Sequence, residues 1–317
     1  MSTDNTPTTL DGTAFLFPGQ GSQAVGMGRA FYDDWPETRA MFDRLDAALD
    51  IDLTGLCFDG TAEAIQQPSI TQPLLLATGL AVYKGVTARF TVEPTYVAGH
   101  SLGHFTALSA AGAMDPAATV QLTHQRGKCM EQAATADGPG TMVAVLLADQ
   151  DEVTQACATR DDVGVALYNA PRQTVISGTT EGVTSVQETL NEQATTTARF
   201  HELDVGAAFH SPVMATAVDC VEQAMGEVTL REAEIPVVSD VSGEIYTEPS
   251  VARQDLTNQI TSAVDWVRVV EQLRAQGIER FVEFPPTGVL SALVERIAPD
   301  ADCLTLETPA DAREVFA

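Results

Sequence analysis

Short apolar runs alternate along the chain with longer segments whose apolar residues recur at helical spacing. The short runs are rich in β-branched and aromatic residues and predict strands at 14–17, 96–98, 142–147, 163–168, 174–177, 235–239 and 281–284. The longer segments predict helices at 72–89, 103–112, 116–134, 211–225 and 264–276. The alternation predicts an α/β fold in which helices cover both faces of a mostly parallel sheet.

One segment, 138–203, follows a different order. Its pattern predicts strand, helix, strand, strand, helix and strand, with the further helices at 149–158 and 180–193 and the last strand at 198–203. That order is ferredoxin-like, and Gly138-Pro139-Gly140 predicts a turn where the segment begins. We therefore expect a small ferredoxin-like subdomain at 138–203, inserted into a large α/β-hydrolase-like domain made of 1–137 and 204–317.

The lengths of the chain and of its apolar runs indicate a globular core and argue against a membrane segment. A chain of 317 residues can bury a sizeable core. Its longest apolar runs, 74–82 and 142–148, are far shorter than the roughly 20 residues that span a bilayer. The first residues are polar and lack the basic start and apolar stretch of a signal peptide. We expect a cytoplasmic protein without a membrane segment.

Acidic residues far outnumber basic ones. There are 44 Asp and Glu against 17 Lys and Arg, and the lysines are Lys84 and Lys128 alone. This balance argues against nucleic acid as a partner. At molar salt the Debye length falls to about 3 Å, so that repulsion among so many carboxylates is screened. The composition therefore predicts a halophilic protein whose stability depends on salt.

The cysteines show no metal or disulfide spacing. There are five of them, an odd number, and no two form a CxxC pair: Cys57, Cys129, Cys157, Cys220 and Cys303. In a reducing compartment this pattern predicts unpaired thiols in the core or on the surface. We expect no structural metal site.

The segment Gly99-His100-Ser101-Leu102-Gly103 is a GxSxG motif between a predicted strand and a predicted helix. Glycines on either side of a serine permit a strained turn that exposes its hydroxyl, and the next N–H can face an oxyanion at the helix N-terminus. The motif therefore predicts a nucleophile elbow. An ordinary Gly-rich turn is the alternative.

A serine hydroxyl needs a base before it can attack. Of the five histidines, His210 is the best candidate because it lies at a predicted junction of loop and helix, where functional side chains are commonly presented. A structural histidine at a helix start is the alternative for His210. The others lie beside the serine, in mid-helix or in a strand: His100, His104, His124 and His201.

A Gly- and Gln-rich loop, 18–23, follows the first predicted strand. Such a loop exposes backbone N–H groups, so Gln20 could supply a second oxyanion donor beside that of Leu102. The Walker lysine of a phosphate loop is missing, and the glycine spacing does not fit a dinucleotide fingerprint. A plain tight turn is the alternative.

Together these motifs resemble the malonyl-CoA:acyl-carrier-protein transacylase family, which includes the acyltransferase domains of polyketide synthases. The resemblance covers nearly the whole chain. Its segments, in order, are Phe17-Pro18-Gly19-Gln20-Gly21-Ser22-Gln23, Gly99-His100-Ser101-Leu102-Gly103, Arg126-Gly127-Lys128, Tyr168-Asn169-Ala170-Pro171, Phe209-His210-Ser211-Pro212, and Gln259 ahead of Val264-Asp265-Trp266.

The resemblance assigns a role to each matching position. It implies that Ser101 is acylated, that His210 is the general base and acid, and that Arg126 pairs with the malonyl carboxylate. A guanidinium suits that role because its planar fork matches a carboxylate, although Arg126 alone would equally fit a surface ion pair. The remaining implied roles are oxyanion donation by Gln20 and Leu102, orientation of the histidine by the Gln259 carbonyl, and pocket lining by Phe209, His100 and Asn169.

The implied reaction is a ping-pong transfer of malonyl from malonyl-CoA to the phosphopantetheine thiol of an acyl carrier protein. Leu102 and Phe209 resemble the malonyl-selective members rather than the methylmalonyl-selective ones. The implied enzyme has no bound cofactor and serves fatty-acid or polyketide synthesis, and we expect it to be a monomer. Two alternatives are a serine hydrolase or thioesterase of the α/β-hydrolase type and a catalytically silent carrier-docking protein.

Three positions depart from the common pattern of the family. His104 replaces a glutamate, Asp240 replaces an asparagine, and Pro285-Pro286-Thr287 replaces a Gly-Pro-Gly turn. We interpret His104 as an exposed substitution and expect the three changes to alter the pocket rim and the carrier-protein face. Because carrier proteins are acidic, we also expect basic residues near the mouth of the site, with Lys84, Lys128 and Arg172 as candidates.

Overall fold

The computed structural model describes residues 7–138, 140–193 and 198–317, and its larger sheet contains the strand that leads to Ser101. The strand order is β11-β10-β1-β2-β7-β8, and every neighbouring pair is parallel except β7 and β8. The strands are β1 (Thr8–Phe17), β2 (Val92–Gly99), β7 (Val237–Val238), β8 (Ile245–Tyr246), β10 (Arg280–Glu283) and β11 (Asp302–Thr305). The predicted mostly parallel sheet is confirmed.

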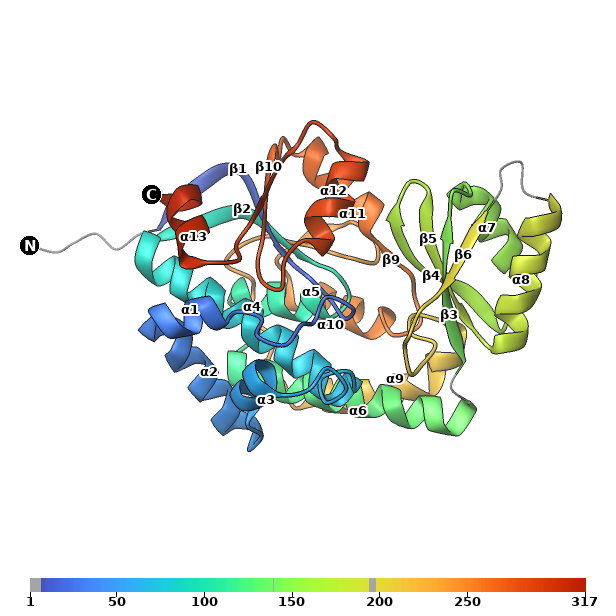
Figure 1. The fold of residues 1–317 in the computed structure, drawn as a ribbon, viewed down its shortest axis with the longest axis horizontal. Helices are drawn as coiled ribbons and strands as arrows, with labels where there is room; N and C mark the ends of the chain where they lie inside the picture. The colour runs from blue at the N-terminus through green and yellow to red at the C-terminus, as the bar shows by residue number, and fades with distance from the viewer. Residues whose placement is uncertain (1–6, 139, 194–197) are drawn as a thin grey trace, which may run out of the picture.

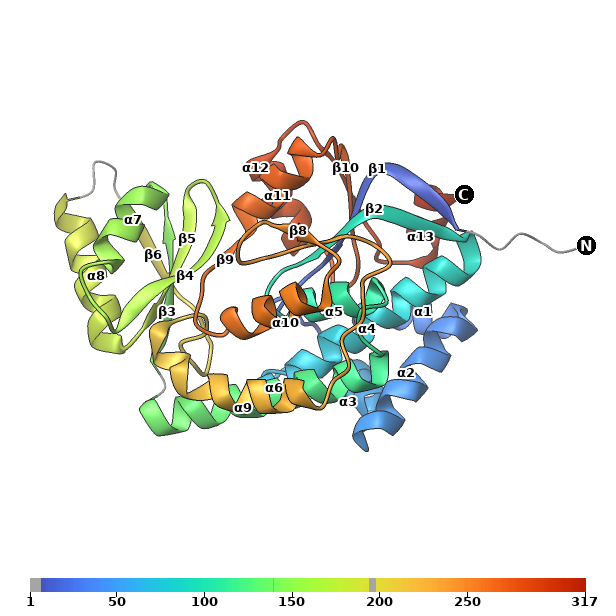
Figure 2. The same cartoon turned by 180° about the vertical axis from the view of Figure 1, so that it is seen from behind.

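Alternating side chains of β1 explain why helices cover both faces of this sheet. Phe15 and Phe17 belong to the core that α4 and α5 complete, whereas Ala14 and Leu16 belong to the core formed with α11 and α12. Figures 1 and 2 show these two helical layers on either side of the sheet. Because side chains alternate along a strand, apolar residues on both faces require a covered sheet.

The helices of this part of the molecule pack on the sheet and on one another. They are α1 (Arg29–Asp34), α2 (Pro36–Leu49), α3 (Leu53–Asp59), α4 (Pro68–Phe90), α5 (Leu102–Ala110), α6 (Pro116–Asp137), the 3₁₀ turn η1 (Pro212–Met214), α9 (Ala215–Gly226), α10 (Pro249–Asn258), α11 (Trp266–Ala275), α12 (Val289–Ile297) and α13 (Pro309–Phe316). Helix α4 is buried along most of its length, which explains the long apolar run near residue 75.

The second sheet is formed mainly by the predicted insert. Its strands are β3 (Thr141–Leu146), β4 (Val163–Ala170), β5 (Gln173–Gly178) and β6 (Arg199–Glu202), in the antiparallel order β6-β3-β5-β4. The helices α7 (Gln150–Cys157) and α8 (Thr180–Gln193) lie on its outer face (Figure 1). This is the ferredoxin-like arrangement, and the predicted fold class is confirmed. The boundaries of the insert remain a prediction, and Pro139 of its first turn lies outside the described residues.

The sequence prediction differs from the structure at several elements. The predicted helix at 264–276 begins with a short strand, β9 (Val264–Asp265), which pairs in parallel with β4 and ties the small sheet to the rest of the molecule. The predicted strand at 235–239 shortens to the two residues of β7. The prediction also missed six helices and two strands of the described residues: α1, α2, α3, α10, α12, α13, β8 and β11.

The expectation that all cysteines are unpaired is wrong. Cys129 of α6 and Cys220 of α9 form a disulfide, with their Cα atoms 5.8 Å apart. The two helices pack side by side, so residues separated by 91 positions in the sequence come within bonding distance. The other three cysteines, Cys57, Cys157 and Cys303, are free.

Strand β1 begins and helix α13 lies on the same side of the molecule, opposite the small sheet (Figure 1). Helix α13, near the C-terminus, packs beside α1. Within the described ranges, each helix is either too short or too polar to cross a bilayer. The longest, α4, is buried in the core along most of its length.

Candidate active site

Ser101 lies in a sharp turn between β2 and α5. Its backbone has φ 51° and ψ −106°, a strained conformation for a residue with a side chain. A Cβ added to Gly99 would lie 2.0 Å from the backbone of Gly103, and one added to Gly103 would lie 1.9 Å from the Phe17 oxygen. Only glycine therefore fits on either side of the serine. The GxSxG spacing is explained by this close approach of strand, turn and helix.

The hydroxyl of Ser101 meets the ring of His210. Ser101 Oγ lies 2.7 Å from His210 Nε2, and His210 Nδ1 lies 2.7 Å from the backbone oxygen of Gln259. A carbonyl oxygen only accepts hydrogen bonds, so Nδ1 must carry the proton and donate. In this tautomer Nε2 accepts from the serine hydroxyl, as a general base requires.

His210 is held in its neutral form. Burial lowers its pKa to about 3, and the nearby positive charge of Arg126 adds to the effect. The imidazole is only 4 % exposed. At neutral pH it is therefore uncharged and free to accept a proton.

Arg126 enters the same site from α6. Its NH1 donates to the Gln72 side-chain oxygen and its NH2 to that of Gln259, each at 2.9 Å. The guanidinium also lies over the ring of Phe105, at 5.2 Å from its centre. Burial lowers the pKa of Arg126 to about 10, partly offset by the charge of Asp240. Within the described residues, its Nε is buried and has no hydrogen-bond partner.

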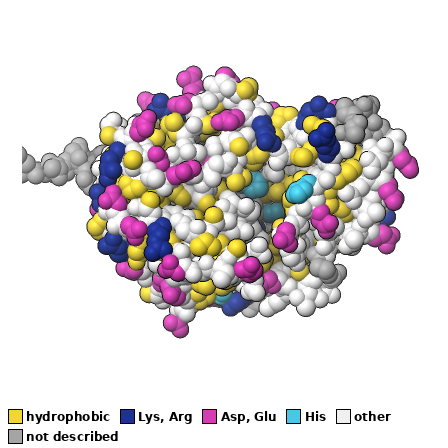
Figure 3. All heavy atoms as spheres, viewed as in Figure 1, with side chains coloured by type: hydrophobic (Ala, Val, Ile, Leu, Met, Phe, Trp, Pro, Cys, Tyr) yellow, Lys and Arg dark blue, Asp and Glu magenta, His cyan; other side chains and the backbone are white. Residues whose placement is uncertain are grey.

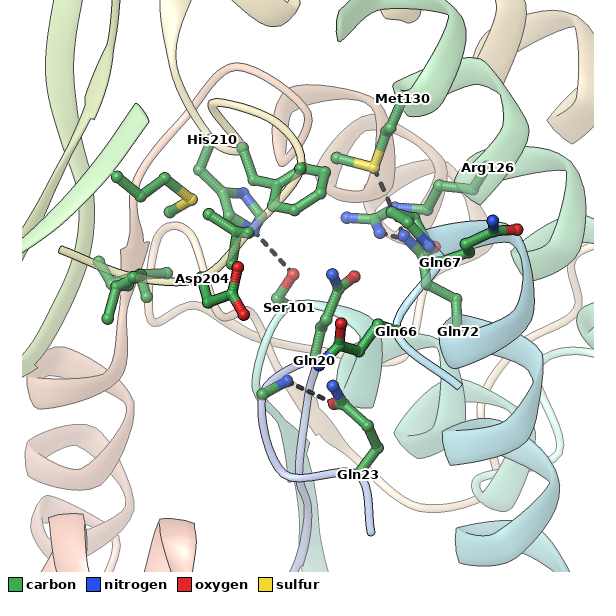
Figure 4. Close-up of a pocket in the computed structure, with 18 of the residues that line it drawn as sticks. Gln20, Gln23, Gln66, Gln67, Gln72, Ser101, Arg126, Met130, Asp204 and His210 are labelled. Atoms are coloured by element: carbon green, nitrogen blue, oxygen red, sulfur yellow. Dashed lines mark hydrogen bonds between the residues drawn. The ribbon is translucent and has the colours of Figure 1, made fainter. Parts of the chain in front are cut away.

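These side chains face a cavity of about 650 Å³ between the large sheet and the small sheet. Figure 4 shows His210 and Arg126 reaching into it from opposite sides, with Ser101 between them. Figure 3 shows the hollow from outside, with histidine side chains in and beside it. The volume fits a small-molecule substrate. The lining includes four residues predicted at the site besides Ser101 and Arg126: Gln20, His100, Phe209 and His210.

The strand pairing brings the loop of Gln20 to the serine turn. Strand β1 pairs with β2 so that Phe17 lies opposite Gly99, and His100 N donates to Phe17 O at 3.0 Å. The loop of Gln20 therefore follows directly beside the turn. Leu102 is the first residue of α5, where backbone N–H groups point out of the helix.

The predicted pocket residue Asn169 lies on β4 and contacts a second predicted residue. Its side-chain oxygen is 3.0 Å from His100 Nε2. Burial lowers the pKa of His100, which keeps this ring neutral as well. Asn169 thus fixes the ring that lies next to Ser101, and it ties the small sheet to the serine turn.

The interpretation of His104 as exposed is wrong. Its side chain is 0 % exposed, because α5 is buried on all sides, and Nε2 lies 3.0 Å from Asp255 Oδ2 and 2.7 Å from the Tyr246 hydroxyl. Asp240 is also buried and lies behind the serine turn rather than at the pocket rim. Possible metal-ligand atoms of His104, Asp240 and Asp255 lie within 4.8 Å of one another.

Two further residues belong to the site although the sequence reasoning missed their roles. Gln72 binds Arg126, and Asp240 accepts hydrogen bonds from the Ser101 N–H and the Gln259 amide. Gln72 could have been singled out from the sequence, because it is a polar residue just ahead of the apolar run of α4. For Asp240 the departure from the family pattern was the signal, but its partners are far away in the sequence.

Comparisons with known proteins agree with this geometry. A family model described as "Acyl transferase domain" matches residues 14–306. The malonyl CoA-acyl carrier protein transacylase of Bacillus subtilis (strain 168) is 36% identical over 288 residues, covering 90% of both chains. The crystal structure of such a transacylase from Xanthomonas oryzae has a TM-score of 0.91 at 36% identity and covers 98% of each chain.

A further solved structure is a malonyl-transacylase in complex with a type II PKS acyl-carrier protein. It is similar to this chain with a TM-score of 0.90 at 28% identity, covering 96% of this chain and 98% of that one. Both the sequence matches and the structural matches extend over nearly the full length. The chain therefore belongs to the acyl transferase domain family and, within it, to the malonyl-CoA:acyl carrier protein transacylases.

Proposed function

We propose that this chain transfers malonyl from malonyl-CoA to the phosphopantetheine thiol of an acyl carrier protein, with Ser101 as the nucleophile. The observation that carries the proposal is the line of contacts from Ser101 through His210 to the Gln259 carbonyl, with Arg126 in the same cavity. A neutral backbone carbonyl stands in the place of a triad carboxylate, so it fixes the tautomer without adding charge.

In the first half-reaction, Ser101 Oγ attacks the thioester carbonyl while its proton moves to His210 Nε2. The oxyanion forms near the N–H groups of Leu102 and Gln20, which serve as donors. The tetrahedral intermediate then collapses, the C–S bond breaks, and the departing CoA thiolate receives the proton from His210. A malonyl-serine ester remains.

In the second half-reaction, the carrier thiol gives its proton to His210 and attacks this ester. The same oxyanion donors act again, the bond to Ser101 Oγ breaks, and His210 returns the proton to the serine. The two half-reactions use one set of groups, which is why a ping-pong scheme fits a single pocket.

Arg126 selects for a carboxylate on the acyl group. Its side-chain hydrogen-bond partners, Gln72 and Gln259, are neutral amides, and no ion pair joins it to a carboxylate among the described residues. Asp240 acts on Arg126 only through space, so a buried guanidinium without a directly bonded carboxylate gains from a bidentate one. Malonyl supplies that group and acetyl does not. Phe209 lines the cavity, whereas the Leu102 side chain is buried and is not part of the lining. Both resemble the malonyl-selective members and favour malonyl over methylmalonyl.

The two alternative functions have less support. A hydrolase or thioesterase would need no buried arginine facing the acyl group. A silent carrier-docking protein would have no reason to keep Ser101, His210 and Gln259 in hydrogen-bonding register. The relatives are transacylases by name, which favours transfer over both.

The acceptor is an acyl carrier protein of fatty-acid or type II polyketide synthesis. Two relatives support a polyketide acceptor, since one is named a polyketide biosynthesis protein and another was solved with a type II PKS carrier. The carrier approaches near Arg172, the half-exposed residue in the turn after β4, the strand that carries Asn169. Basic side chains gather above the hollow where β4 and β5 meet (Figure 3). Lys84 instead packs over the Tyr83 ring.

We place the enzyme in the cytoplasm as a monomer that needs no bound cofactor and works at high salt. The acidic composition supports the salt requirement. The alternative location is an oxidising compartment, which the Cys129–Cys220 disulfide favours. Fractionation of the native cells would decide between the two compartments.

Mass spectrometry tests the proposed function directly. After incubation with malonyl-CoA, the wild-type protein should carry a malonyl group on Ser101, and Ser101→Ala should carry none. Addition of a phosphopantetheinylated carrier should discharge the adduct onto the carrier thiol. Release of free malonate without a carrier would support a hydrolase, and a wild type that forms no adduct would support a docking protein.

A further inference from the structure

Three buried ionisable side chains lie behind the turn that carries Ser101. They come from different elements: His104 from α5, Asp240 from the segment after β7, and Asp255 from α10. The side chains of His104 and Asp240 are 0% exposed and that of Asp255 is 8% exposed. None of them lines the cavity, so the proposed reaction does not use them directly.

Asp240 is bonded to two parts of the site at once. Its Oδ2 accepts from the Ser101 N–H at 2.7 Å and from the Gln259 side-chain amide at 2.8 Å, and its Oδ1 lies 3.1 Å from the same amide nitrogen. The amide nitrogen of Gln259 also donates to the Ser101 carbonyl at 3.0 Å. The carboxylate therefore holds the Ser101 N–H directly and the Ser101 carbonyl through the Gln259 amide.

Gln259 links Asp240 to both His210 and Arg126. Its backbone oxygen holds His210, and its side-chain oxygen accepts from Arg126. Because Asp240 accepts from the amide nitrogen, it fixes which end of the amide faces Arg126. One buried carboxylate thus sets the orientation of the nucleophile, the base and the acyl-binding arginine.

A carboxylate in this position needs a positive neighbour to stay ionised. Burial raises the pKa of Asp240 to about 6, while His104 acts to lower it. His104 Nδ1 lies 4.0 Å from Asp240 Oδ1, and His104 Nε2 lies 3.0 Å from Asp255 Oδ2, so the imidazole stands between the two carboxylates. Burial lowers the pKa of His104, but Asp240 and Asp255 outweigh this and raise it above its ordinary value. The charged and titratable groups facing Asp240 are His104, Asp255, Tyr246 and Arg126.

We propose that Asp240 and His104 act together as positioning residues: the Asp240 carboxylate holds the Ser101 turn and the Gln259 amide, and a protonated His104 keeps that carboxylate ionised. Asp255 completes the set, since both carboxylates face the one imidazolium, and Asp240 also faces the Arg126 guanidinium. This proposal rests on the proposed function, because the groups it positions are those of malonyl transfer. Metal binding is not needed to explain the cluster, because Asp240 already accepts hydrogen bonds on both oxygens.

The test compares Asp240→Asn, His104→Gln, the double variant and the wild type. The rate of Ser101 malonylation is measured against malonyl-CoA concentration from pH 6 to 9. In Asp240→Asn the charge and one acceptor are lost, so kcat/KM should fall about tenfold at every pH. In His104→Gln the carboxylate is left without its cation, so kcat/KM should fall similarly at low pH and recover as the pH rises.

The double variant separates a linked pair from two independent defects. Because His104 acts through the charge of Asp240, the double variant should be no worse than Asp240→Asn and should lack the pH-dependent recovery. His201→Gln, an exposed histidine on β6, is the matched control and should keep the wild-type profile. Three results would each overturn the proposal. They are an unchanged kcat/KM in the single variants, a loss in the double variant equal to the product of the two single losses, and a His104→Gln variant whose kcat/KM does not recover at high pH.

A second measurement is independent of malonyl transfer. A fluorophosphonate probe labels an activated serine without a malonyl group, so its rate reports the Ser101 turn and His210 alone. Across the four proteins, the labelling rates should follow the same order and pH dependence as kcat/KM for malonylation. Failure of malonylation in the wild type would overturn the proposed function, whereas equal probe labelling in all four proteins would overturn the positioning role.

Discussion

The guanidinium of Arg126 donates to the side-chain oxygen of Gln259 at 2.9 Å, while the backbone oxygen of the same Gln259 lies 2.7 Å from His210 Nδ1. One residue therefore joins the proposed acyl-binding group to the proposed base. A substrate carboxylate that pairs with Arg126 also offsets the positive charge that lowers the pKa of His210. Substrate binding and proton transfer are thus electrostatically linked.

The acyl preference should depend on Arg126. In Arg126→Met, kcat/KM for malonyl-CoA should fall about 10- to 100-fold, because a charge-assisted bidentate contact is lost. Acetyl-CoA, which has no carboxylate, should lose far less. A competition assay with both thioesters and one carrier protein measures the ratio. An unchanged ratio would mean that Arg126 does not bind the acyl group.

Stability should fall with acid because of His210. Its folded-state pKa of about 3 lies below the ordinary 6.5. As the pH falls from 6.5 toward 3, the unfolded chain therefore binds a proton at this residue while the folded chain does not. Stability is therefore present above pH 6.5 and is lost as the pH falls toward 3. Between pH 7.5 and 5 the wild type should lose about 2 kcal/mol more than His210→Asn.

Urea unfolding of both proteins at each pH, with salt held constant, measures this difference. Contributions from other groups, such as Asp240, are common to both proteins and cancel in the comparison. Equal losses in the two proteins would show that the native imidazole is not held neutral.

The fold should need salt. With 44 acidic residues against 17 basic ones, the native surface is strongly self-repelling unless ions screen it. The thermal unfolding midpoint should rise steeply between low salt and molar KCl. Equimolar NaCl separates screening from a specific potassium effect. A midpoint that is the same with and without salt would contradict the halophilic assignment.

The Cys129–Cys220 disulfide should stabilise the packing of α6 on α9. It closes a loop spanning 91 positions, and loss of such a cross-link costs about 4 to 5 kcal/mol in the chain-entropy limit. Cys129→Ser should lower the free energy of unfolding, and dithiothreitol should lower that of the wild type but leave that of Cys129→Ser unchanged. Cys303→Ser, at a free cysteine, is the control. Insensitivity of the wild type to reduction would argue against the disulfide in solution.

Carrier binding should depend on Arg172. In Arg172→Glu the KM for the carrier protein should rise several-fold, while the KM for malonyl-CoA should stay unchanged, because charge reversal repels an acidic partner. Arg280→Glu is a matched control, since the two side chains are 48% and 49% exposed and Arg280 lies on β10, paired with Asp302. Equal effects of both variants would indicate a loss of net charge rather than a docking site.

The sequence alone determined the local features of this protein. The alternation of apolar runs predicted the parallel sheet and the ferredoxin-like insert, because strand and helix periodicities are local. The glycines around Ser101 predicted the turn, because only residues without a Cβ fit the approach of Phe17 and Gly103. The motif order also indicated the family before any distance was known.

Only the tertiary structure decided which distant residues meet. His104 was interpreted as exposed and is buried against Asp255, and Cys129 was expected to be a free thiol and is paired with Cys220. Neither pairing leaves a local pattern, because the partners are separated by more than ninety positions and meet only when helices pack. Burial and charge compensation are properties of the assembled core, so they became visible only once the elements were in place.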